Sequence, residues 1–407
     1  MNQEQYEAKQ SYALIYINRK NLQAKIPLEV HRIEKDYAVL KKTQFPPAAC
    51  VNDVFRVEIP NPAPVLIIRI YTVDGGIFLG MHLHHAIGDG RSLNNLITWL
   101  TAQTRGDKYE FGPLNLSPPI DEAELPRLDG TPPTFPEREV NATEGETRQA
   151  CVVKDFYLDL RKIEMIRGYI GKKWEFTTMT IVSALTWAHA TKARYGAFQG
   201  DNELEDEARI LYIMDGRNAL GVGAEEYFGN LVEINTKKHP LSTLVESCGD
   251  ASTKTNPDTE DDWKAMAERL MPVLRSIQEC VNDLKKEYVL KRYAQYGQLL
   301  SRPEPQKPKL SFSFGKTTDF LMNTWRHLGM NEKQKWKLLD DSEPVYPDAL
   351  CRGVSDIDCP SAMVMPVVPD GPEKESLIRL MIVLEKNAMK LLMKDEVFQS
   401  MVSKVVE

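Results

Sequence analysis

The stretch MHLHHAIGDG, residues 81–90, lies between a predicted strand and a predicted helix. Before it, β-branched residues from Val65 to Tyr71, the turn residues Asp74-Gly75-Gly76 and the apolar run Ile77–Leu83 predict a β-hairpin. After it, apolar residues at positions 93, 96, 97 and 100 predict an amphipathic helix that ends near Gly106. The stretch is therefore expected to be a glycine-flanked loop that joins strand to helix.

The three histidines of this stretch are predicted to differ in the face of the strand that they occupy. A period of two places His85 on the apolar face with Met81 and Leu83, and it places His82 and His84 on the opposite face. Low polarity disfavours the charged imidazolium, so His85 is expected to be neutral and able to accept a proton. These properties suit a general base at a substrate channel, although a purely structural histidine fits the same position.

The other residues of the stretch allow more than one interpretation. Gly88 and Gly90 let the backbone turn tightly and let another molecule approach closely. Asp89 precedes the helix and could serve only as its N-cap. His82 and His84 could share a metal ion, but no further cluster of Cys and His completes a site. We therefore expect no bound metal.

Composition narrows the class of protein. The 407 residues are 42% hydrophobic and 27% charged, which is typical of a soluble globular protein of about two domains. The formal net charge of −7 argues against nucleic acid or an anionic membrane as the main partner. No apolar run approaches the ~20 residues that a bilayer crossing needs, and the first ten residues are polar. Six cysteines form no CxxC pair. A cytoplasmic enzyme is the expectation.

Strands alternate with helices in both halves of the chain, which predicts a mixed α and β fold of two domains. The segment 111–150 holds seven of the 25 prolines, many charges and little apolar periodicity. It is predicted to be a linker between a first domain, residues 1–110, and a second domain, residues 151–407. In the second domain we predict a buried helix at 179–196, a buried strand at 209–215, a helical stripe at 263–284, a strand at 377–385 and a helix from 386.

Two motifs resemble a known enzyme family. HHAIGDG is similar to the HxxxDG motif of CoA-dependent acyltransferases. Asp215-Gly216-Arg217, followed by Tyr227-Phe228-Gly229-Asn230, resembles the DGR and YFGN elements of its BAHD branch. The resemblance runs from about Ile67 to Phe398, and the fungal trichothecene O-acetyltransferases are the most similar group. It implies two chloramphenicol-acetyltransferase-like domains with a solvent channel at their interface.

The resemblance also implies roles for individual residues. His85 would take a proton from an acceptor hydroxyl, which then attacks the thioester of acyl-CoA, with acetyl-CoA as the expected co-substrate. Asp89 would pair with Arg217 and brace the motif rather than take part in a chemical step. Gly90 and Asn323-Thr324-Trp325 would line the acyl and acceptor pocket, where either Asn323 or Thr324 could donate to the oxyanion. The expected product is an acylated small secondary metabolite, made by a monomeric enzyme.

Two departures from the family keep other functions open. Only 84 residues precede His85, fewer than in most members, so the first strands and part of the acceptor pocket are expected to be missing. The DFGWG motif expected after Trp325 is replaced by GMNEKQKWKLLDDSEP, residues 329–344. The alternatives are a cyclase or pericyclase-type enzyme on the same scaffold and a catalytically silent small-molecule-binding protein. The sequence does not identify the acceptor, the acyl chain or the CoA-binding basic residues.

Overall fold

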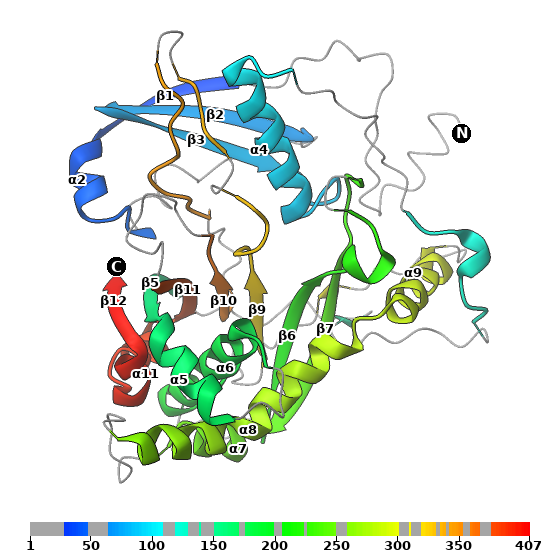
Figure 1. Cartoon of the computed structure of the whole chain (residues 1–407), viewed down its shortest axis with the longest axis vertical. Helices are drawn as coiled ribbons and strands as arrows, with labels where there is room; N and C mark the ends of the chain where they lie inside the picture. The colour runs from blue at the N-terminus through cyan, green and yellow to red at the C-terminus, as the bar shows by residue number, and fades with distance from the viewer. Residues whose placement is uncertain are drawn as a thin grey trace.

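The computed structural model places two sheets one above the other (Figure 1). Of the 407 residues, it describes 28–47, 64–108, 119–128, 138–139, 150–170, 176–198, 206–223, 226–249, 259–300, 309–310, 319–330, 334–338, 342–352, 359–366 and 376–407.

The first sheet has the strand order β1-β2-β3, and the predicted hairpin supplies its central strand and one edge strand. β2 and β3 pair antiparallel around Gly75, whose φ of +83° is the left-handed region that glycine adopts without strain. β1 pairs parallel to β2, and two helices flank the sheet. The elements are β1 (Leu28–Asp36), α2 (Tyr37–Lys42), β2 (Leu66–Asp74), β3 (Gly76–Leu83) and α4 (Gly90–Arg105).

The helix predicted after the HxxxDG motif is confirmed as α4. It begins directly after its N-cap Asp89 and ends at Gly106, whose φ of +74° terminates the helix in a left-handed cap. Asp89 is thus the N-cap of α4. It can also pair with Arg217, as the resemblance implies, because a residue that caps a helix can bind a second group.

The second sheet has seven strands and a mixed arrangement of directions. β6, β9 and β10 run parallel to one another, so their carboxyl ends meet at one edge, and β7 starts at that edge because it is antiparallel to β6. Figure 1 shows this edge pointing toward α4. In sheet order, the strands are β12 (Val402–Val406), β5 (Cys151–Asp159), β11 (Leu377–Glu385), β10 (Ser361–Val364), β9 (Asp319–Thr324), β6 (Glu207–Asp215) and β7 (Val232–Pro240).

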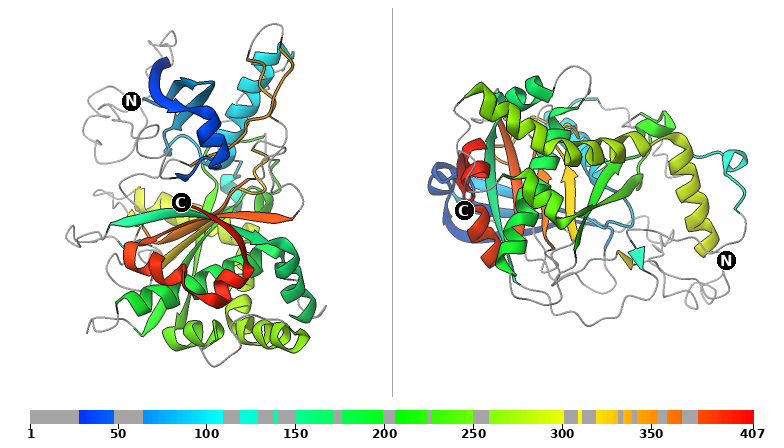
Figure 2. Two further views of the ribbon diagram at one scale, coloured as in Figure 1. Left: turned by 90° about the vertical axis from the view of Figure 1, so that its left-hand side faces the viewer. Right: turned by 90° about the horizontal axis from the view of Figure 1, so that it is seen from below.

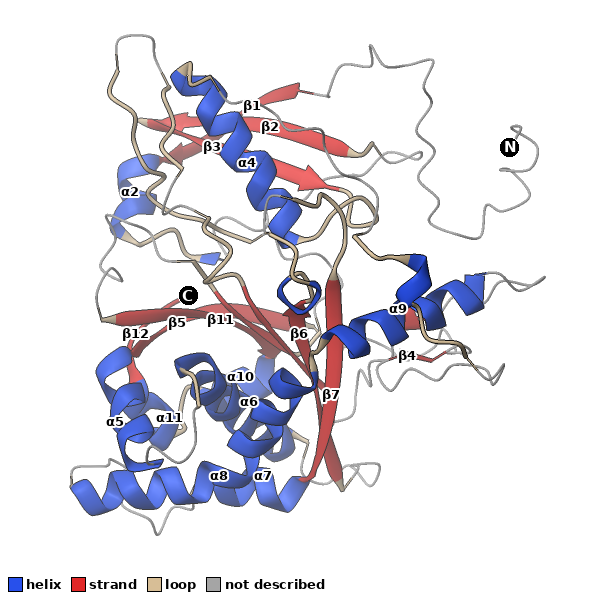
Figure 3. Cartoon of the chain, turned by 45° about the vertical axis from the view of Figure 1, so that its right-hand side comes forward, coloured by secondary structure: helices blue, strands red, loops and turns tan. Residues whose placement is uncertain are grey.

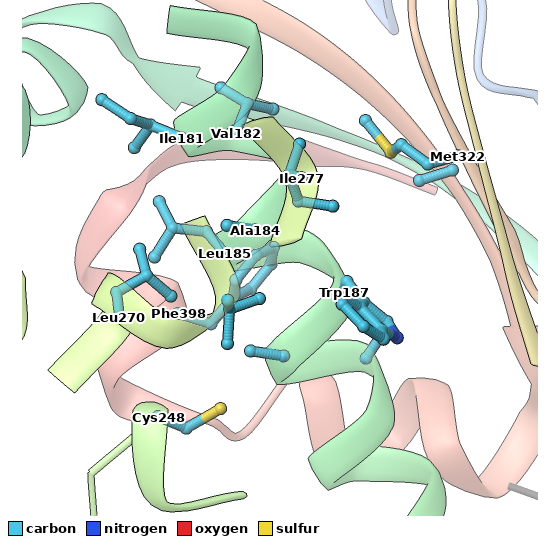
Figure 4. Close-up of a cluster of buried hydrophobic side chains, with 14 of the residues drawn as sticks. Ile181, Val182, Ala184, Leu185, Trp187, Cys248, Leu270, Ile277, Met322 and Phe398 are labelled. Atoms are coloured by element: carbon cyan, nitrogen blue, oxygen red, sulfur yellow. The ribbon is translucent and has the colours of Figure 1, made fainter. Parts of the chain in front are cut away.

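A layer of helices covers the face of the second sheet that is turned away from the first sheet (Figures 2 and 3). The predicted buried helix is confirmed as α6, which is buried on nearly all sides because helices surround it and the sheet lies above it. Figure 4 shows Ile181, Leu185 and Trp187 of α6 within this core. The helices are α5 (Leu160–Ile170), α6 (Thr178–Ala197), α7 (Leu241–Ser247), α8 (Glu260–Asp283), α10 (Lys386–Leu392) and α11 (Glu396–Met401).

One predicted element ends earlier than the sequence indicates. α8 begins with a capping box between Thr259 and Asp262 and ends at Asp283, so Leu284 lies outside the helix as its C-cap. Val281 is 37% exposed, so the buried stripe ends at Cys280 rather than at Leu284. The prediction was wrong there because an apolar residue can follow the helical period without having a neighbour to pack against.

The remaining described elements connect these layers. They are η2 (Glu122–Glu124), η3 (Asn218–Leu220), α9 (Lys286–Leu300) and the pair β4 (Arg138–Glu139) with β8 (Lys309–Leu310). Much of the predicted linker 111–150 lies outside the described residues, so the domain boundaries at 110 and 150 stay a prediction. The mixed α and β fold class is confirmed. Within the described ranges, none of the helices is both long and apolar enough to cross a bilayer.

A buried charged cluster joins α6 to the C-terminal helices. His189 Nδ1 lies 2.9 Å from Asp395 Oδ2, and their side chains are 1% and 7% exposed. Lys192 Nζ lies 3.3 Å from the same oxygen. Burial alone would lower the pKa of His189, but Cys248 and Asp395 beside it outweigh burial and raise that pKa to about 10. The imidazolium form is therefore the one that the fold stabilises.

This cluster makes stability depend on pH. Since the pKa of His189 is raised on folding, its contribution is fully present below its ordinary value of about 6.5 and is lost as the pH rises to about 10. The difference in Tm between wild type and His189→Gln should be largest near pH 6 and shrink toward pH 10 in thermal unfolding. Asn282→Ala, which removes an exposed side chain that does not titrate, is the control, and its effect on Tm should not vary with pH. A difference independent of pH would contradict the assignment.

Candidate active site

Asp89 is the residue around which the site is built. Its Oδ1 accepts from the backbone N–H of Arg91 at 3.1 Å and of Ser92 at 3.0 Å, so the side chain caps the N-terminus of α4. Only 3% of the residue is exposed. A buried carboxylate needs further partners, because an unpaired charge in the interior is costly.

Arg217, at the carboxyl end of β6, is that partner. Its Nη1 donates to Asp89 Oδ2 at 2.8 Å and its Nη2 donates to Asp89 Oδ1 at 3.1 Å, which is a bidentate pair. The two side chains are 2% and 1% exposed. Burial would lower the pKa of Arg217, but Asp89 and Asp215 outweigh it and raise that pKa. The structure thus joins α4 to the end of the second sheet, 128 residues away in sequence.

The YFGN segment completes this junction. Gly229 N donates to Ser92 Oγ at 3.0 Å, and Gly229 O accepts from Ser92 Oγ at 2.9 Å and from Arg217 Nη2 at 2.8 Å. Leu231 N donates to Asp89 Oδ2 at 3.0 Å. The sequence predicts no role for Ser92, and it marks YFGN only as an element of the family resemblance. The structure places YFGN just before β7, at the same edge of the sheet as Arg217.

His85 does not have the surroundings that the sequence predicts. β3 ends at Leu83, and a turn follows in which Ile87 N donates to His84 O at 2.8 Å. His85 lies within this turn and is exposed. The expectation that His85 lies on the apolar face of the strand was wrong, because the turn closes before the strand period reaches it. An exposed imidazole is instead accessible to a substrate from solvent.

The other two histidines of the motif lie in β3 and at the start of the turn that follows it. His82 pairs with Ile67 in the hairpin, and burial together with Arg69 lowers its pKa, so its ring is neutral near pH 7. His84 Nδ1 accepts from Ala86 N at 3.2 Å. No group of three or more metal-binding side chains occurs in the described part of the chain.

Gly90 lies against the residue that follows β9. A Cβ atom at Gly90 would come within 3.2 Å of Trp325 Nε1 and 3.1 Å of Leu328 Cδ1, so a larger residue would press on both. Arg91 next to it donates to Leu328 O at 2.7 Å and to His327 O at 3.2 Å. The structure therefore brings Gly90 and Trp325 together, and it fixes the turn after β9 to the first turn of α4.

Asn323 and Thr324 point to opposite faces of the second sheet. Thr324 Oγ1 lies 4.0 Å from Met179 Sδ in α6, which places it on the side covered by helices. Since side chains alternate along a strand, Asn323 faces the other side, as does Trp325, which packs against Met363, Met365 and Met381. The structure does not place Thr324 with the other predicted pocket residues. Of the two candidate oxyanion donors, Asn323 alone faces the first sheet.

The segment that replaces DFGWG binds α4. Gln334 is buried, and its Nε2 donates to Asn94 Oδ1 at 2.7 Å. Further on, Lys337 N donates to Thr104 Oγ1 at 3.2 Å. Residues 334–338 thus run along α4 from Asn94 to Thr104. The segment that stands in place of DFGWG therefore joins α4 to the second half of the chain.

A model of the Transferase family matches residues 39–250, just over half of the chain, and includes HHAIGDG, DGR and YFGN. The chain belongs to the Transferase family. This is the family of the BAHD-type acyltransferases that its motifs resemble. The HxxxDG and DGR elements that define the resemblance are the two that form the buried ion pair.

Two curated relatives are similar to parts of the chain. An acyltransferase of Cordyceps militaris, cm3D, is 25% identical over 264 residues, which are 55% of this chain and 53% of the relative. Vinorine synthase of Rauvolfia serpentina is 26% identical over 188 residues, 43% of this chain and 40% of the relative. The chain therefore spans about half the length, or less, of these relatives.

Solved structures share the fold over most of the chain. TRI101 of F. sporotrichioides, complexed with Coenzyme A and T-2, has a TM-score of 0.63 at 17% identity, covering 94% of this chain and 82% of that chain. TRI101 of F. graminearum, complexed with Ethyl Coenzyme A, has a TM-score of 0.62 at 14% identity with the same coverage. Vinorine synthase has a TM-score of 0.53 at 17% identity, covering 89% of this chain and 75% of that chain. At these identities the likeness shows the two-domain fold.

The ion pair predicts a loss of stability when either partner is removed. Arg217→Ala should cost ~3–5 kcal/mol, because the Asp89 carboxylate stays buried without the cation that it pairs with, whereas Asp89→Asn should cost less, because Arg217 keeps Asp215 Oδ1 at 3.0 Å. Denaturant unfolding measures this loss, and any activity of the protein should fall with it.

The matched control is Arg161→Ala, which breaks a pair of similar length. Arg161 Nη2 lies 2.8 Å from Asp159 Oδ2, but its side chain is 81% exposed, so the change should cost at most ~1 kcal/mol. An Asp89→Asn protein as stable as wild type but inactive would instead make Asp89 a direct participant in catalysis.

Proposed function

We propose that this protein is an acyltransferase that moves an acyl group, with acetyl as the first candidate, from acyl-CoA to a hydroxyl of a small secondary metabolite. His85 is the general base. Transfer to an amine instead of a hydroxyl would use the same base, and a panel of alcohols and amines distinguishes the two kinds of acceptor.

The observation that carries the proposal is the difference between Asp89 and His85 within the HxxxDG motif. Both oxygens of Asp89 accept hydrogen bonds from buried donors, so this carboxylate is occupied as a brace. His85, four residues earlier, is exposed in the turn that the brace supports. A family member whose motif keeps one histidine accessible and its aspartate internally satisfied fits a single-base mechanism.

The proposed reaction needs no covalent enzyme intermediate. The acceptor hydroxyl gives its proton to His85, and its oxygen forms a bond to the thioester carbonyl carbon, so the carbonyl oxygen becomes an oxyanion. Asn323, facing the first sheet, is the candidate donor to this oxyanion. The oxyanion then collapses, the C–S bond breaks, and the CoA thiolate takes the proton from His85. The base returns to its starting state.

Both substrates are supported by the comparisons. TRI101 structures hold Coenzyme A together with T-2 or Deoxynivalenol, so a protein of this fold binds CoA and a small acceptor at once. We propose the same two classes of partner here, in a channel between the two halves of the chain. We also propose that the enzyme acts as a monomer in the cytoplasm.

Replacing the base should abolish transfer without unfolding the protein. His85→Ala should lower kcat by ~10²–10⁴-fold, the usual contribution of a positioned general base, and leave Tm unchanged because the side chain is exposed. Release of free thiol from acetyl-CoA, measured with a panel of alcohols and amines, provides the assay.

His31→Ala is the matched control, since it removes an exposed histidine of the first sheet and should leave kcat unchanged. A His85→Ala protein that transfers at the wild-type rate would show that another group is the base. A wild type that releases no thiol with any acceptor, yet binds and converts a metabolite without acetyl-CoA, would favour the cyclase. The replacement of DFGWG by a segment bound to α4 is the observation that keeps that alternative in view.

Binding of CoA should stabilise the fold. At a hundred times its Kd, CoA adds roughly 2.7 kcal/mol, which raises Tm by a few degrees. The net charge of −7 repels the phosphates overall, so a local basic patch must hold them, and the shift should shrink as salt rises. Differential scanning fluorimetry with CoA, and with dephospho-CoA as control, measures both effects. No shift at low salt with CoA or acetyl-CoA would contradict the transferase proposal.

A further inference from the structure

The peptide between His85 and Ala86 is held at both of its polar atoms. Ala86 N donates to His84 Nδ1 at 3.2 Å, and His85 O accepts from Asn230 Nδ2 at 2.6 Å. Because a peptide unit is planar, two hydrogen bonds on opposite sides fix the orientation of that plane. This plane contains the Cα atom of His85, so the two bonds fix the position of the atom that carries the imidazole side chain.

The two bonds come from different halves of the chain. His84 belongs to the turn itself, and its own N donates to Val65 O at 2.8 Å at the end of the hairpin. Asn230 belongs to the second sheet, 145 residues further along. The position of the His85 backbone therefore depends on contacts from both halves of the chain.

Asn230 is itself held in place on both sides. Its neighbour Gly229 bonds to Ser92, and its other neighbour Leu231 bonds to Asp89. The backbone of residues 229–231 is thus fixed to the N-terminus of α4, only a few residues after His85. The side-chain amide of Asn230 reaches His85 O from a rigid base, although the residue is exposed.

We propose that Asn230 is a positioning residue for the transfer reaction, which aims His85 by holding the carbonyl of its peptide. The inference rests on the proposed function of His85. Asn230 touches no reacting atom, so its loss should change the rate of the chemical step and not the binding of acyl-CoA. A misplacement of a catalytic group by about 1 Å can cost ~10²-fold in rate.

The proposed role differs from a structural one in what it leaves unchanged. A single hydrogen bond at an exposed side chain contributes little to stability. A structural role would therefore appear as a loss of Tm, whereas positioning appears as a loss of kcat at constant Tm and constant KM for acetyl-CoA.

Asn230→Asp is the sharpest variant, because aspartate has the same shape and cannot donate to a carbonyl. We expect kcat to fall ~10–100-fold, with KM for acetyl-CoA within about twofold and Tm within about one degree of wild type. Asn230→Ala should behave alike. Asn282→Ala is the matched control: it removes an exposed asparagine of α8 with one side-chain hydrogen bond, to Gln278, and should change nothing. A kcat for Asn230→Asp within twofold of wild type would overturn the inference.

A second measurement separates this inference from the proposed function. The NMR resonances of the His85 ring and the Ala86 amide should shift in Asn230→Asp and stay unchanged in Asn282→Ala. If wild type transfers no acyl group, the proposed function fails, but shifted resonances still show that Asn230 sets the turn. Unshifted resonances overturn the inference whatever the activity.

Discussion

A buried ion pair between Asp89 and Arg217 is the interaction on which the geometry of this protein depends. The Asp89 side chain caps α4, and Arg217 lies at the carboxyl end of β6. The backbone of Gly229 and Leu231 bonds to these two side chains, so three elements from both halves of the chain meet at the pair. Ion pairs at a surface contribute little, but a pair that is 1–2% exposed cannot lose Arg217 without leaving the Asp89 carboxylate buried and without the cation that it pairs with. The two halves are therefore joined in one relative position.

The second sheet supplies the place for this junction. Because β6, β9 and β10 are parallel, the residues after each strand lie along one edge, and β7 begins there as well. Arg217 follows β6 and Trp325 follows β9, so the brace and the residue beside Gly90 reach α4 from neighbouring strands. A histidine on a turn directly before that helix is then presented to solvent at the same edge.

Local pattern predicted the parts of this arrangement that depend on neighbours in sequence. The hairpin, α4, α6 and β11 follow from apolar period and turn residues, and their bounds agree closely with the structure. The Asp89–Arg217 pair came from family resemblance, since no local signal links residues 128 apart. The surroundings of His85 could not be predicted, because a single hydrogen bond between Ile87 and His84 decides where the strand stops.

The same limit applies to the contacts that the sequence analysis missed. Ser92 with Gly229, Gln334 with Asn94 and Asn230 with His85 each join residues more than a hundred positions apart, through polar atoms that leave no periodic pattern. The opposite facing of Asn323 and Thr324, in contrast, follows from strand alternation as soon as the bounds of β9 are known.

A crystal structure of the protein with coenzyme A tests the central claim most directly. The claim is that the ion pair holds His85 where the acyl donor and the acceptor meet. We predict that the sulfur of bound coenzyme A lies within hydrogen-bond reach of the His85 imidazole, directly or through one water, with Asp89 and Arg217 still paired. Coenzyme A bound with its sulfur remote from His85 would contradict the account.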